Sequence, residues 1–313
     1  GAVPGALAGG GGAGRGVHRT RRRGRRGGVN WRRHGDAGSD QLIIGHLNIQ
    51  SYKPKLHDLR NDIHDVYGFD VLALCETWLA PPVPDRLVGV SGYKLHRRDR
   101  PASSGLPRGK GGVAVLVRDS LSCELLPTPV TGVAGSNLEI IWVLVRTSKH
   151  QSVLVASAYR VPQNTARQLA TDLDDLEQQL QHMIANFPRA TLILSGDLNC
   201  CLLKAKTSDT NPLIRLCTTY GLHITNQSRA TYRTAGSLLD VIITNRPELI
   251  RRVGVTRCHY GGPHDFTRVL LARDSRVAPR RESAVYRRPI SRIDSDSFNQ
   301  QLADTNWTPV YYC

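Results

Sequence analysis

The sequence of 313 residues lacks any unbroken run of about 18 apolar residues, so we expect no transmembrane helix. It begins without a methionine and without an apolar N-terminal segment, which predicts no signal peptide and is consistent with a fragment of a longer protein. The seven cysteines contain no Cys-x-x-Cys pair and form no even set, which favours free thiols in a reducing, intracellular compartment. No internal repeat, G-x-G-x-x-G loop or P-loop is present, which argues against the common nucleotide-binding folds.

Acidic residues are absent from the beginning of the chain: residues 1–35 hold nine arginines and no Asp or Glu. A second basic stretch, residues 273–292, holds seven arginines against two acidic residues, and the whole chain has a formal net charge of +16. Such flanks suit a polyanionic partner, because each cation that neutralises a phosphate releases condensed counterions. A solubilising tail, or non-coding sequence translated in frame, is the alternative interpretation.

Glycine is concentrated in the same N-terminal region, where residues 1–38 contain 13 of the 29 glycines. These residues cannot bury enough apolar surface to offset chain entropy, so we predict a disordered Gly/Arg-rich arm. From residue 39 the texture changes to short runs rich in β-branched residues, which predicts one domain over residues 39–272. Residues 273–313 are then a basic linker and the beginning of a further segment.

The apolar runs in 39–272 predict strands near residues 42–47, 71–75, 113–117, 138–145, 152–159, 191–194, 239–244 and 266–271. Apolar spacing predicts one helix from Leu56 to Val66 and another from Leu169 to Ile184, with a weaker helix over 212–220. Strands and helices that mix without strict alternation favour a two-sheet α/β sandwich over a Rossmann fold or a TIM barrel.

Polar side chains stand at the ends of the predicted strands, where loops gather into an active site. They are Asn48, Glu76, Tyr159, Asp197, Asn199, Asp240 and His264. Carboxylate and amide oxygens are hard ligands that suit Mg²⁺ or Mn²⁺. A histidine held by an aspartate has a fixed tautomer and a stabilised charged form. Together these residues have the chemistry for metal-assisted hydrolysis of a phosphoester.

Each of these residues taken alone has a simpler explanation. A single Glu or Asn after a strand is usually a surface or turn residue, and Tyr159 alone fits a core position. The adjacent Cys200 and Cys201 are poorly placed to chelate one ion, and we interpret them as packing at a strand end. The combination and its order along the chain are what favour a catalytic site.

The succession LNIQS, CETWL, GGVAVLVR, SAYR-P, LSGDLN, SLLDVIITN and a Pro-His before the final strand resembles the endonuclease/exonuclease/phosphatase superfamily over residues 41–272. The branch that it most resembles is the apurinic-like endonuclease domain of LINE-type (non-LTR) retrotransposons. The resemblance implies a DNase I-like, four-layer α/β sandwich with helices on the outer faces. It also implies metal-dependent nicking of double-stranded DNA that leaves a 3′-hydroxyl.

The resemblance also implies a larger setting for the domain. Residues 287–313 resemble the segment that joins such an endonuclease to a reverse transcriptase, although no reverse-transcriptase motif is present in the chain. The implied partner is therefore a reverse transcriptase domain of the same polyprotein. Because chromosomal DNA is the implied target, we expect nuclear localisation.

Position by position, the resemblance implies a role for each candidate residue. Glu76 is the principal metal ligand, with Asn48 close by in the metal and phosphate network. Asp197 orients or deprotonates the attacking water, helped by Asn199. Tyr159 contacts the scissile phosphate or the leaving oxygen. His264, oriented by Asp240, stabilises the charge that develops on the phosphate.

One position departs from the family pattern, which usually reads Ser-Asp-His at the last motif. Here the run is Gly262-Pro263-His264-Asp265, so the acid before the histidine is missing. Asp265 is a candidate substitute, but neighbouring side chains on an extended chain point to opposite faces. The departure puts catalytic efficiency in question.

The basic segment 97–112, between two predicted strands, is a candidate DNA-contacting loop. The expected phosphate contacts are Arg97, Arg98, Arg100, Arg108 and Lys110, with Arg160 beside the site. Two alternatives remain open. One is an apurinic-site repair endonuclease, or a lipid or inositol phosphatase, on the same fold. The other is a catalytically impaired remnant that only binds DNA.

Overall fold

The computed structural model describes residue 1, residues 41–272 except 108, 148–150, 163–164, 205–210 and 261, and residues 294–305. The predicted arm 1–38, apart from its first residue, and the basic linker 273–292 lie outside the described residues. The proposed limits of the domain therefore stay predictions. None of the helices in the described segments is long and apolar enough to cross a membrane.

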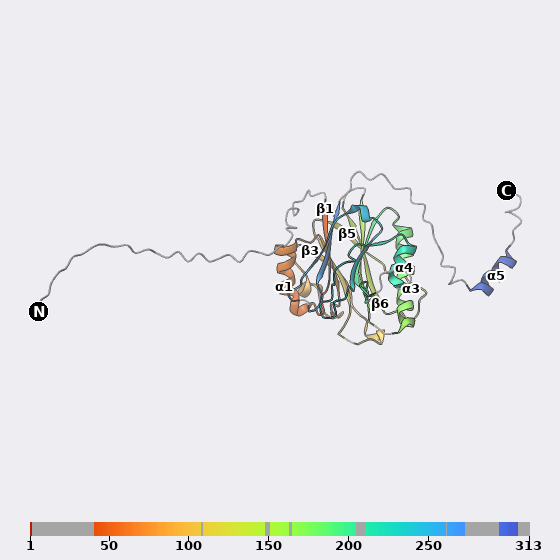
Figure 1. The fold of residues 1–313 in the computed structure, drawn as a ribbon, viewed down its shortest axis with the longest axis horizontal. Coiled ribbons are helices and arrows are strands. Elements are labelled where there is room, and N and C mark those ends of the chain that lie inside the picture. The colour runs from red at the N-terminus through yellow and green to blue at the C-terminus, as the bar shows by residue number, and fades with distance from the viewer. Residues whose placement is uncertain are drawn as a thin grey trace.

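Two mixed sheets, each with six strands in the described residues, face one another (Figure 1). The first has the order β11-β12-β1-β2-β4-β3, and the second has the order β5-β6-β7-β8-β10-β9. The strands of the first sheet are β1 (Gln41–Asn48), β2 (Val71–Cys75), β3 (Tyr93–Arg98), β4 (Val113–Arg118), β11 (Ile250–Thr256) and β12 (Phe266–Ala272). Those of the second are β5 (Ser122–Leu126), β6 (Leu138–Arg146), β7 (Ser152–Arg160), β8 (Thr191–Asp197), β9 (His223–Ile224) and β10 (Asp240–Thr244).

Helices cover the outer face of each sheet, as Figure 1 shows with α1 on one side and α3 and α4 on the other. α1 (Leu56–Asn61) continues into a π-helical segment, η3 (Asp62–Tyr67), and packs on the first sheet. α3 (Ala166–Asn186) and α4 (Pro212–Thr219) pack on the second sheet. The predicted four-layer DNase I-like α/β sandwich is confirmed, because a third apolar cluster fills the space between the two sheets.

Short helical segments complete the described chain. They are α2 (Asp85–Val88), α5 (Ser295–Asp304), η2 (Lys53–Lys55), η4 (Ala102–Ser104) and η5 (Pro247–Leu249). The long helices begin at side-chain caps: Thr165 accepts a hydrogen bond from the Gln168 amide, and Asn211 accepts from the Leu213 amide. The helices predicted over 169–184 and 212–220 are confirmed as α3 and α4.

The eight predicted strands are present, and the four strands that were not predicted are all sheet edges. They are β3 and β11 in the first sheet and β5 and β9 in the second. Edge strands are half solvated and carry polar side chains, so they lack the apolar runs by which a buried strand is recognised. One prediction is corrected by this: Arg97 and Arg98 belong to strand β3 rather than to a loop.

The predicted helix over 56–66 is partly wrong. Leu56, Leu59 and Ile63 are buried as the apolar spacing implied, but Val66 is 44% exposed. The π-helical geometry from Asp62 onwards changes the number of residues per turn, so a 3.6-residue period no longer predicts the buried face.

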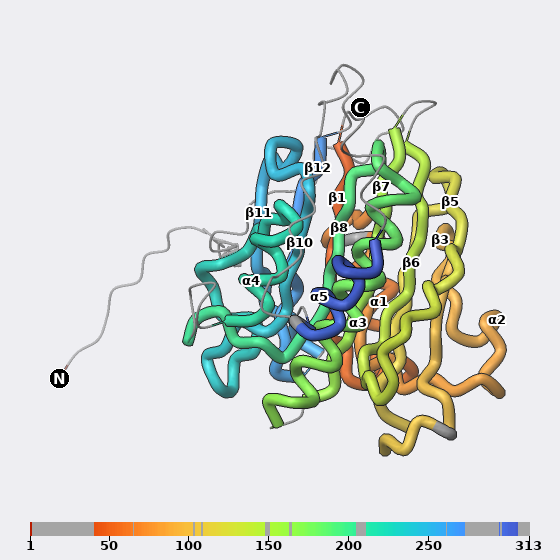
Figure 2. The backbone as a smooth tube through the Cα atoms, turned by 90° about the vertical axis from the view of Figure 1, so that its right-hand side faces the viewer, coloured from red at the N-terminus to blue at the C-terminus, as the bar shows by residue number. Residues whose placement is uncertain are grey.

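The active-site candidates depend on how the two sheets align. Within the first sheet β1 and β2 run parallel, and within the second β7 and β8 run parallel, so the carboxyl ends of each pair come together. β1 and β8 lie side by side across the space between the sheets (Figure 2). Side chains alternate between faces along a strand, and Asn48 and Asp197 are among those that face the opposite sheet.

Candidate functional site

Asn48 connects the two sheets at the place where β1, β2 and β8 end. Its Nδ2 donates one hydrogen bond of 2.8 Å to Oε1 of Glu76 and another of 2.8 Å to Oδ2 of Asp197. Asn48 is fully buried, and Asp197 is 2% exposed. One amide thus fixes two carboxylates, one from each sheet, in a common site.

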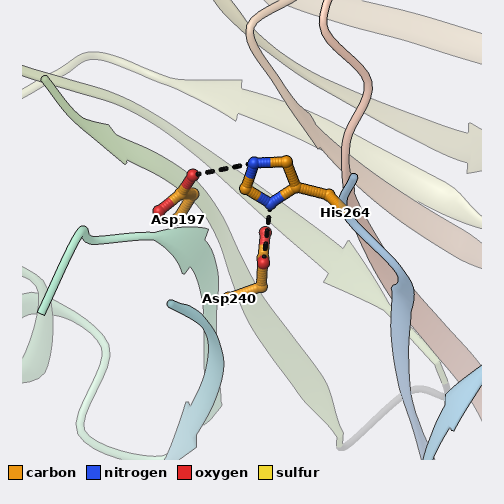
Figure 3. A group of neighbouring side chains, drawn as sticks. All are labelled: Asp197, Asp240 and His264. Atoms are coloured by element: carbon orange, nitrogen blue, oxygen red, sulfur yellow. Dashed lines mark hydrogen bonds and ion pairs between the residues drawn. The ribbon is translucent and has the colours of Figure 1, made fainter. Parts of the chain in front are cut away.

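His264 lies beside this carboxylate pair, in the turn before β12 (Figure 3). Its Nδ1 donates to Oδ2 of Asp240 at 2.9 Å, and its Nε2 lies 3.8 Å from Oδ2 of Asp197. The predicted His264–Asp240 pair is therefore formed, although the two residues are 24 positions apart.

The charges of this group depend on one another. Burial raises the pKa of Asp197, and the charge of Asp240 raises it further, to about 7. Burial opposes ionisation of Asp240 too, but His264 and His46 outweigh it and hold the pKa of Asp240 well below its usual range. Burial lowers the pKa of His264, whereas Asp240 raises it, and the net effect is a rise. Asp240 is therefore held as an anion, and its charge favours the protonated form of His264.

Tyr159 and Asn199 complete the predicted set. Tyr159 is 5% exposed and pairs with Asp197 across the β7–β8 ladder. Burial and the nearby charges of Glu76 and Asp197 raise its pKa far above its usual value, so its hydroxyl is a permanent donor. The Asn199 amide N–H donates to Oδ1 of Asp197 at 3.1 Å, and its side chain donates to the carbonyl of Arg160 at 2.7 Å. Asn199 therefore shapes the loop and holds Asp197.

Strained backbone is concentrated around the site. Five non-glycine residues have positive φ in the described segments: Gln50 (44°), Ser51 (84°), Glu76 (51°), Trp78 (54°) and Asn199 (51°). All five follow directly after β1, β2 or β8. A positive φ costs of order 1–3 kcal/mol for such residues and persists where surrounding contacts dictate it. Contacts around the site, rather than the preferences of the local backbone, therefore hold these loops in their conformation.

The donor set fits a divalent cation. Oδ1 of Asn48 is buried and has no hydrogen-bond partner among the described residues, and the same side chain adjoins Glu76 and Asp197. One ligand atom each from Asp197, Asp240 and His264 also lies within 4.8 Å of the others. Oxygen-rich, crowded anionic sites of this kind are the ones that hard divalent ions occupy. Glu76 and Asn48 would hold the ion, with Asp197 beside it and Asp240 engaged with His264.

Most of the arginines expected along DNA are already bound to protein groups. Arg100 makes an ion pair with Glu139, and Arg160 donates to the carbonyls of Leu198 (2.7 Å) and Asn199 (3.0 Å). The side chains of Arg100 and Arg160 are 6% and 4% exposed in the described structure, and their contact with phosphates stays a prediction. Their burial stabilises the loops around the site.

The remaining basic candidates divide into three cases. Arg97 pairs with Asp85 at 3.0 Å, and Arg98 donates to the Ile140 carbonyl at 3.1 Å, so their contacts with phosphate stay predictions. Arg108 lies outside the described residues. Lys110 is exposed, with its ammonium 3.5 Å from the centroid of the Trp78 ring. Arg98 is exposed as well, so Lys110 and Arg98 are the described candidates that stay available to a phosphate.

The turn that carries His264 is held by a residue that the sequence did not single out. Arg233 donates to the carbonyls of Gly262 and His264 and forms an ion pair with Asp265. Oδ1 of Asp265 also accepts the Cys258 amide N–H at 3.1 Å. Asp265 is thus a structural residue directed away from the site, and it does not replace the acid missing at Pro263.

Two other contacts were not foreseen. The indole N–H of Trp78 donates to Oε2 of Glu76 at 3.1 Å, and Nε2 of His46 lies 3.2 Å from Oδ1 of Asp240. Both partners sit two residues from a predicted site residue, Trp78 after Glu76 and His46 before Asn48. That spacing on an extended strand places His46 on the same face as Asn48, which is the signal that could have identified it.

Comparison with known proteins assigns the arrangement to a family. Residues 45–262 match the Endonuclease/Exonuclease/phosphatase family, which is most of the described domain. The chain belongs to this family. Its members hydrolyse phosphate esters, which agrees with the chemistry of the site. No curated protein sequence matches the chain.

Solved structures show that the fold is shared over about three quarters of the chain. The endonuclease domain of TRAS1, a telomere-specific non-LTR retrotransposon, has a TM-score of 0.55 at 16% identity, covering 74% of this chain and 98% of that one. The 3′ phosphatase NExo from Neisseria, bound to a product DNA hairpin, has a TM-score of 0.57 at 14% identity, covering 73% and 98%. The catalytic domain of Xenopus laevis APE2 has a TM-score of 0.53 at 15% identity, covering 74% and 92%. These likenesses establish the fold.

Proposed function

We propose that this family member is a divalent-metal-dependent DNA endonuclease that nicks target DNA and leaves a 3′-hydroxyl for reverse transcription of a retroelement. The proposal rests on one observation: five polar side chains come together where the two sheets meet. They are Asn48, Glu76, Asp197, Asp240 and His264. Hydrolysis of a phosphodiester needs a positioned nucleophile and neutralisation of the phosphate oxygens, and these residues supply both.

The individual roles follow from the contacts. Asp197 is the group that accepts a proton from an attacking water, because its raised pKa makes it a better base than an ordinary carboxylate. His264, whose protonated form is favoured by Asp240, faces the same space and stabilises negative charge on a phosphate. Tyr159, which stays protonated, donates a hydrogen bond to the phosphate or to the leaving oxygen.

Glu76 and Asn48 would hold the divalent ion, which supplies Lewis-acid polarisation of the phosphate when bound. Mg²⁺ is the proposed ion, with Mn²⁺ as an alternative, since both prefer oxygen ligands. The Trp78 indole and the Asn48 amide each bind one oxygen of Glu76, so this carboxylate is oriented before an ion arrives.

The substrate assignment is supported by the charge of the chain and by its relatives. The basic flanks favour a polyanion, and the solved relatives include a retrotransposon endonuclease and a phosphatase bound to DNA. A reverse transcriptase joined to residues 287–313 and a nuclear location belong to the same proposal.

The test is nicking of supercoiled plasmid, with Mg²⁺ and with EDTA, by the wild type and by His264→Ala. We expect open circles with Mg²⁺ alone, and at least about a 100-fold slower reaction for His264→Ala, because a preorganised group that stabilises charge is removed. His182→Ala, an exposed histidine on α3, is the matched control and should nick at the wild-type rate.

Two further results separate the alternatives. Cleavage confined to an oligonucleotide with an abasic site would replace the proposal with a repair activity. Metal-independent, salt-sensitive DNA binding without any nicking would instead indicate a binding remnant. A nick whose end a polymerase extends without further processing identifies the proposed 3′-hydroxyl.

A further inference from the structure

A polar residue lies in the buried layer directly beneath the site. β1 directs alternate side chains toward the second sheet, and the first two of these, Leu42 and Ile44, belong to the apolar cluster between the sheets. The next in this series is His46, which is fully buried. A buried imidazole costs stability unless its polar atoms are bonded, so the contacts of His46 indicate why the position is not apolar.

His46 contacts the carboxylate that orients His264. Its Nε2 lies 3.2 Å from Oδ1 of Asp240, whose Oδ2 accepts from His264 Nδ1 at 2.9 Å. His46 and Asp240 are both fully buried. Asp240 is therefore held between two imidazoles, one beneath it from β1 and the other beside the site, at the position that Figure 3 shows for His264.

The contacts dictate how both rings are protonated. A carboxylate accepts hydrogen bonds and donates none, so each histidine must present an N–H to it. His46 then carries its proton on Nε2, and His264 carries one on Nδ1. This leaves Nε2 of His264 directed at Asp197, 3.8 Å away, where the reaction is expected.

Within the described residues, the other bonds of Asp240 involve its backbone. Its N–H donates to Oγ1 of Thr231 at 3.0 Å, and its carbonyl accepts from Asn226 at 2.8 Å. Rotation of the carboxylate is therefore opposed at Oδ1 by His46 and at Oδ2 by His264, the residue that Asp240 has to orient.

We propose that His46 is a positioning residue, which locks the Asp240 carboxylate in the rotamer that holds His264 toward Asp197. This inference rests on the proposed nuclease function and extends it to a residue that touches neither substrate nor metal. Nδ1 of His46 has no partner among the described residues, so within this part of the chain the polar contact of the ring is its bond to Asp240.

The first test compares His46→Leu with His46→Gln in plasmid nicking. Leucine removes the donor, whereas glutamine places an amide N–H at nearly the reach of Nε2. For His46→Leu we expect kcat to fall about 10- to 100-fold with KM unchanged, since a misplaced catalytic group slows the reaction without weakening DNA binding. His46→Gln should keep kcat within about three-fold of the wild type.

Thr267→Val is the matched control. Thr267 faces His46 in the β1–β12 register, is fully buried, and its hydroxyl has no partner among the described residues. Its loss should leave both kinetic constants unchanged. An equal loss of kcat in Thr267→Val and His46→Leu would overturn the proposal, because it would show a general effect of repacking this layer.

A double-mutant cycle tests the route through Asp240. In an Asp240→Asn background, His46→Leu should lower kcat by less than about two-fold further, because residues that act as one unit are not additive. If the two substitutions lower kcat independently, so that their separate factors multiply in the double variant, the proposal is overturned.

Spectroscopy tests the same contact without activity, so that a failed inference and a failed nuclease proposal remain distinguishable. In ¹H–¹⁵N spectra of the wild type, His46 should be protonated on Nε2 and bare on Nδ1. The downfield His264 Nδ1 proton, identified by its loss in His264→Ala, should shift or broaden in His46→Leu and persist in His46→Gln. A wild-type His46 protonated on Nδ1 alone would overturn the inference, even if His46→Leu does not fold.

Discussion

At the scale of single residues, the site holds two carboxylates and one imidazole close together. The pKa values of the two carboxylates are shifted in opposite directions. Asp240 is held ionised while Asp197 is pushed toward neutrality, to a pKa of about 7. Pairs of acids whose environments drive their pKa values apart are typical of acid–base chemistry. Asp197 and Asp240 are register partners on β8 and β10, so this difference arises between neighbouring strands.

Pro263 is the residue at which the site departs from the family pattern, and it allows a direct prediction. We expect Pro263→Asp to increase the rate of Mg²⁺-dependent nicking at least about ten-fold, because it restores a carboxylate next to His264. Pro263→Ala is the control, since it removes the ring without adding charge. A rate for Pro263→Asp no higher than that of Pro263→Ala would show that the missing acid does not limit this enzyme.

At the scale of elements, strand ends and the strained turns after them present the reactive groups. The turn after β2 is an example: Glu76 and Trp78 both have positive φ, and the Thr77 and Trp78 amides donate to Gly112 and Gly111. Trp78 binds Glu76, and Lys110 covers the indole. The loop that precedes β4 is thereby tied to the carboxylate that would bind metal.

Removal of the indole N–H should weaken metal binding. We predict that Trp78→Phe lowers the affinity for Mn²⁺ about 10- to 100-fold, because the partner that orients Glu76 is lost. The affinity is measured by titrating DNA-free protein with Mn²⁺ and following the unbound Mn²⁺ by electron paramagnetic resonance. The control is Tyr232→Phe. It removes a hydroxyl group from an aromatic ring that packs on His264 rather than on Glu76. Equal affinities for Trp78→Phe and the wild type would contradict the prediction.

The pairing of β7 and β8 depends on a glycine. A Cβ at Gly196 would lie 2.1 Å from the Ala158 carbonyl oxygen, and that oxygen belongs to backbone that cannot move aside cheaply. We expect Gly196→Ala to destabilise the protein by about 1–3 kcal/mol, as overpacking does. Urea unfolding measures this, with Gly132→Ala as the control, since an added Cβ there has no neighbour within 4 Å. A Gly196→Ala midpoint equal to that of Gly132→Ala would refute the expectation.

At the scale of the whole molecule, charge is distributed unevenly. Most of the net charge of +16 comes from the two flanks, while several arginines near the site are neutralised by Glu139, Asp85 and Asp265. Under the proposed function, the basic flanks would supply general affinity for DNA and the site between the sheets would carry out cleavage.

This division predicts the salt dependence of binding. Six arginines of the N-terminal region would be replaced by glutamine in the full chain: Arg19, Arg21, Arg22, Arg23, Arg25 and Arg26. We expect the slope of log affinity against log salt to become shallower by at least about 2, since each lost phosphate contact removes about 0.9. Fluorescence anisotropy with duplex DNA measures the slope, and an unchanged slope would assign the arm a role other than phosphate binding.

The class of fold, the buried strands and the residues that meet at the site could be predicted before the structure was known, because apolar runs and polar strand ends are local signals. The sequence could not identify the edge strands, whose solvated side chains carry no such run. It also gave no sign that Arg100 binds Glu139 or that Arg160 binds the Leu198 carbonyl, because a basic residue in a sequence does not show which acid or carbonyl will bind it.

The partners that hold the candidate site residues could be identified only once the packing of the two sheets was known. Arg233 binds the His264 turn from 31 residues away, and His46 reaches Asp240 across 194 positions of the chain. Asp265 was excluded as the missing acid in the same way, through its pairing with Arg233. Such contacts depend on how two sheets face one another, and the packing of the sheets is set by all of their side chains together rather than by any local stretch of sequence.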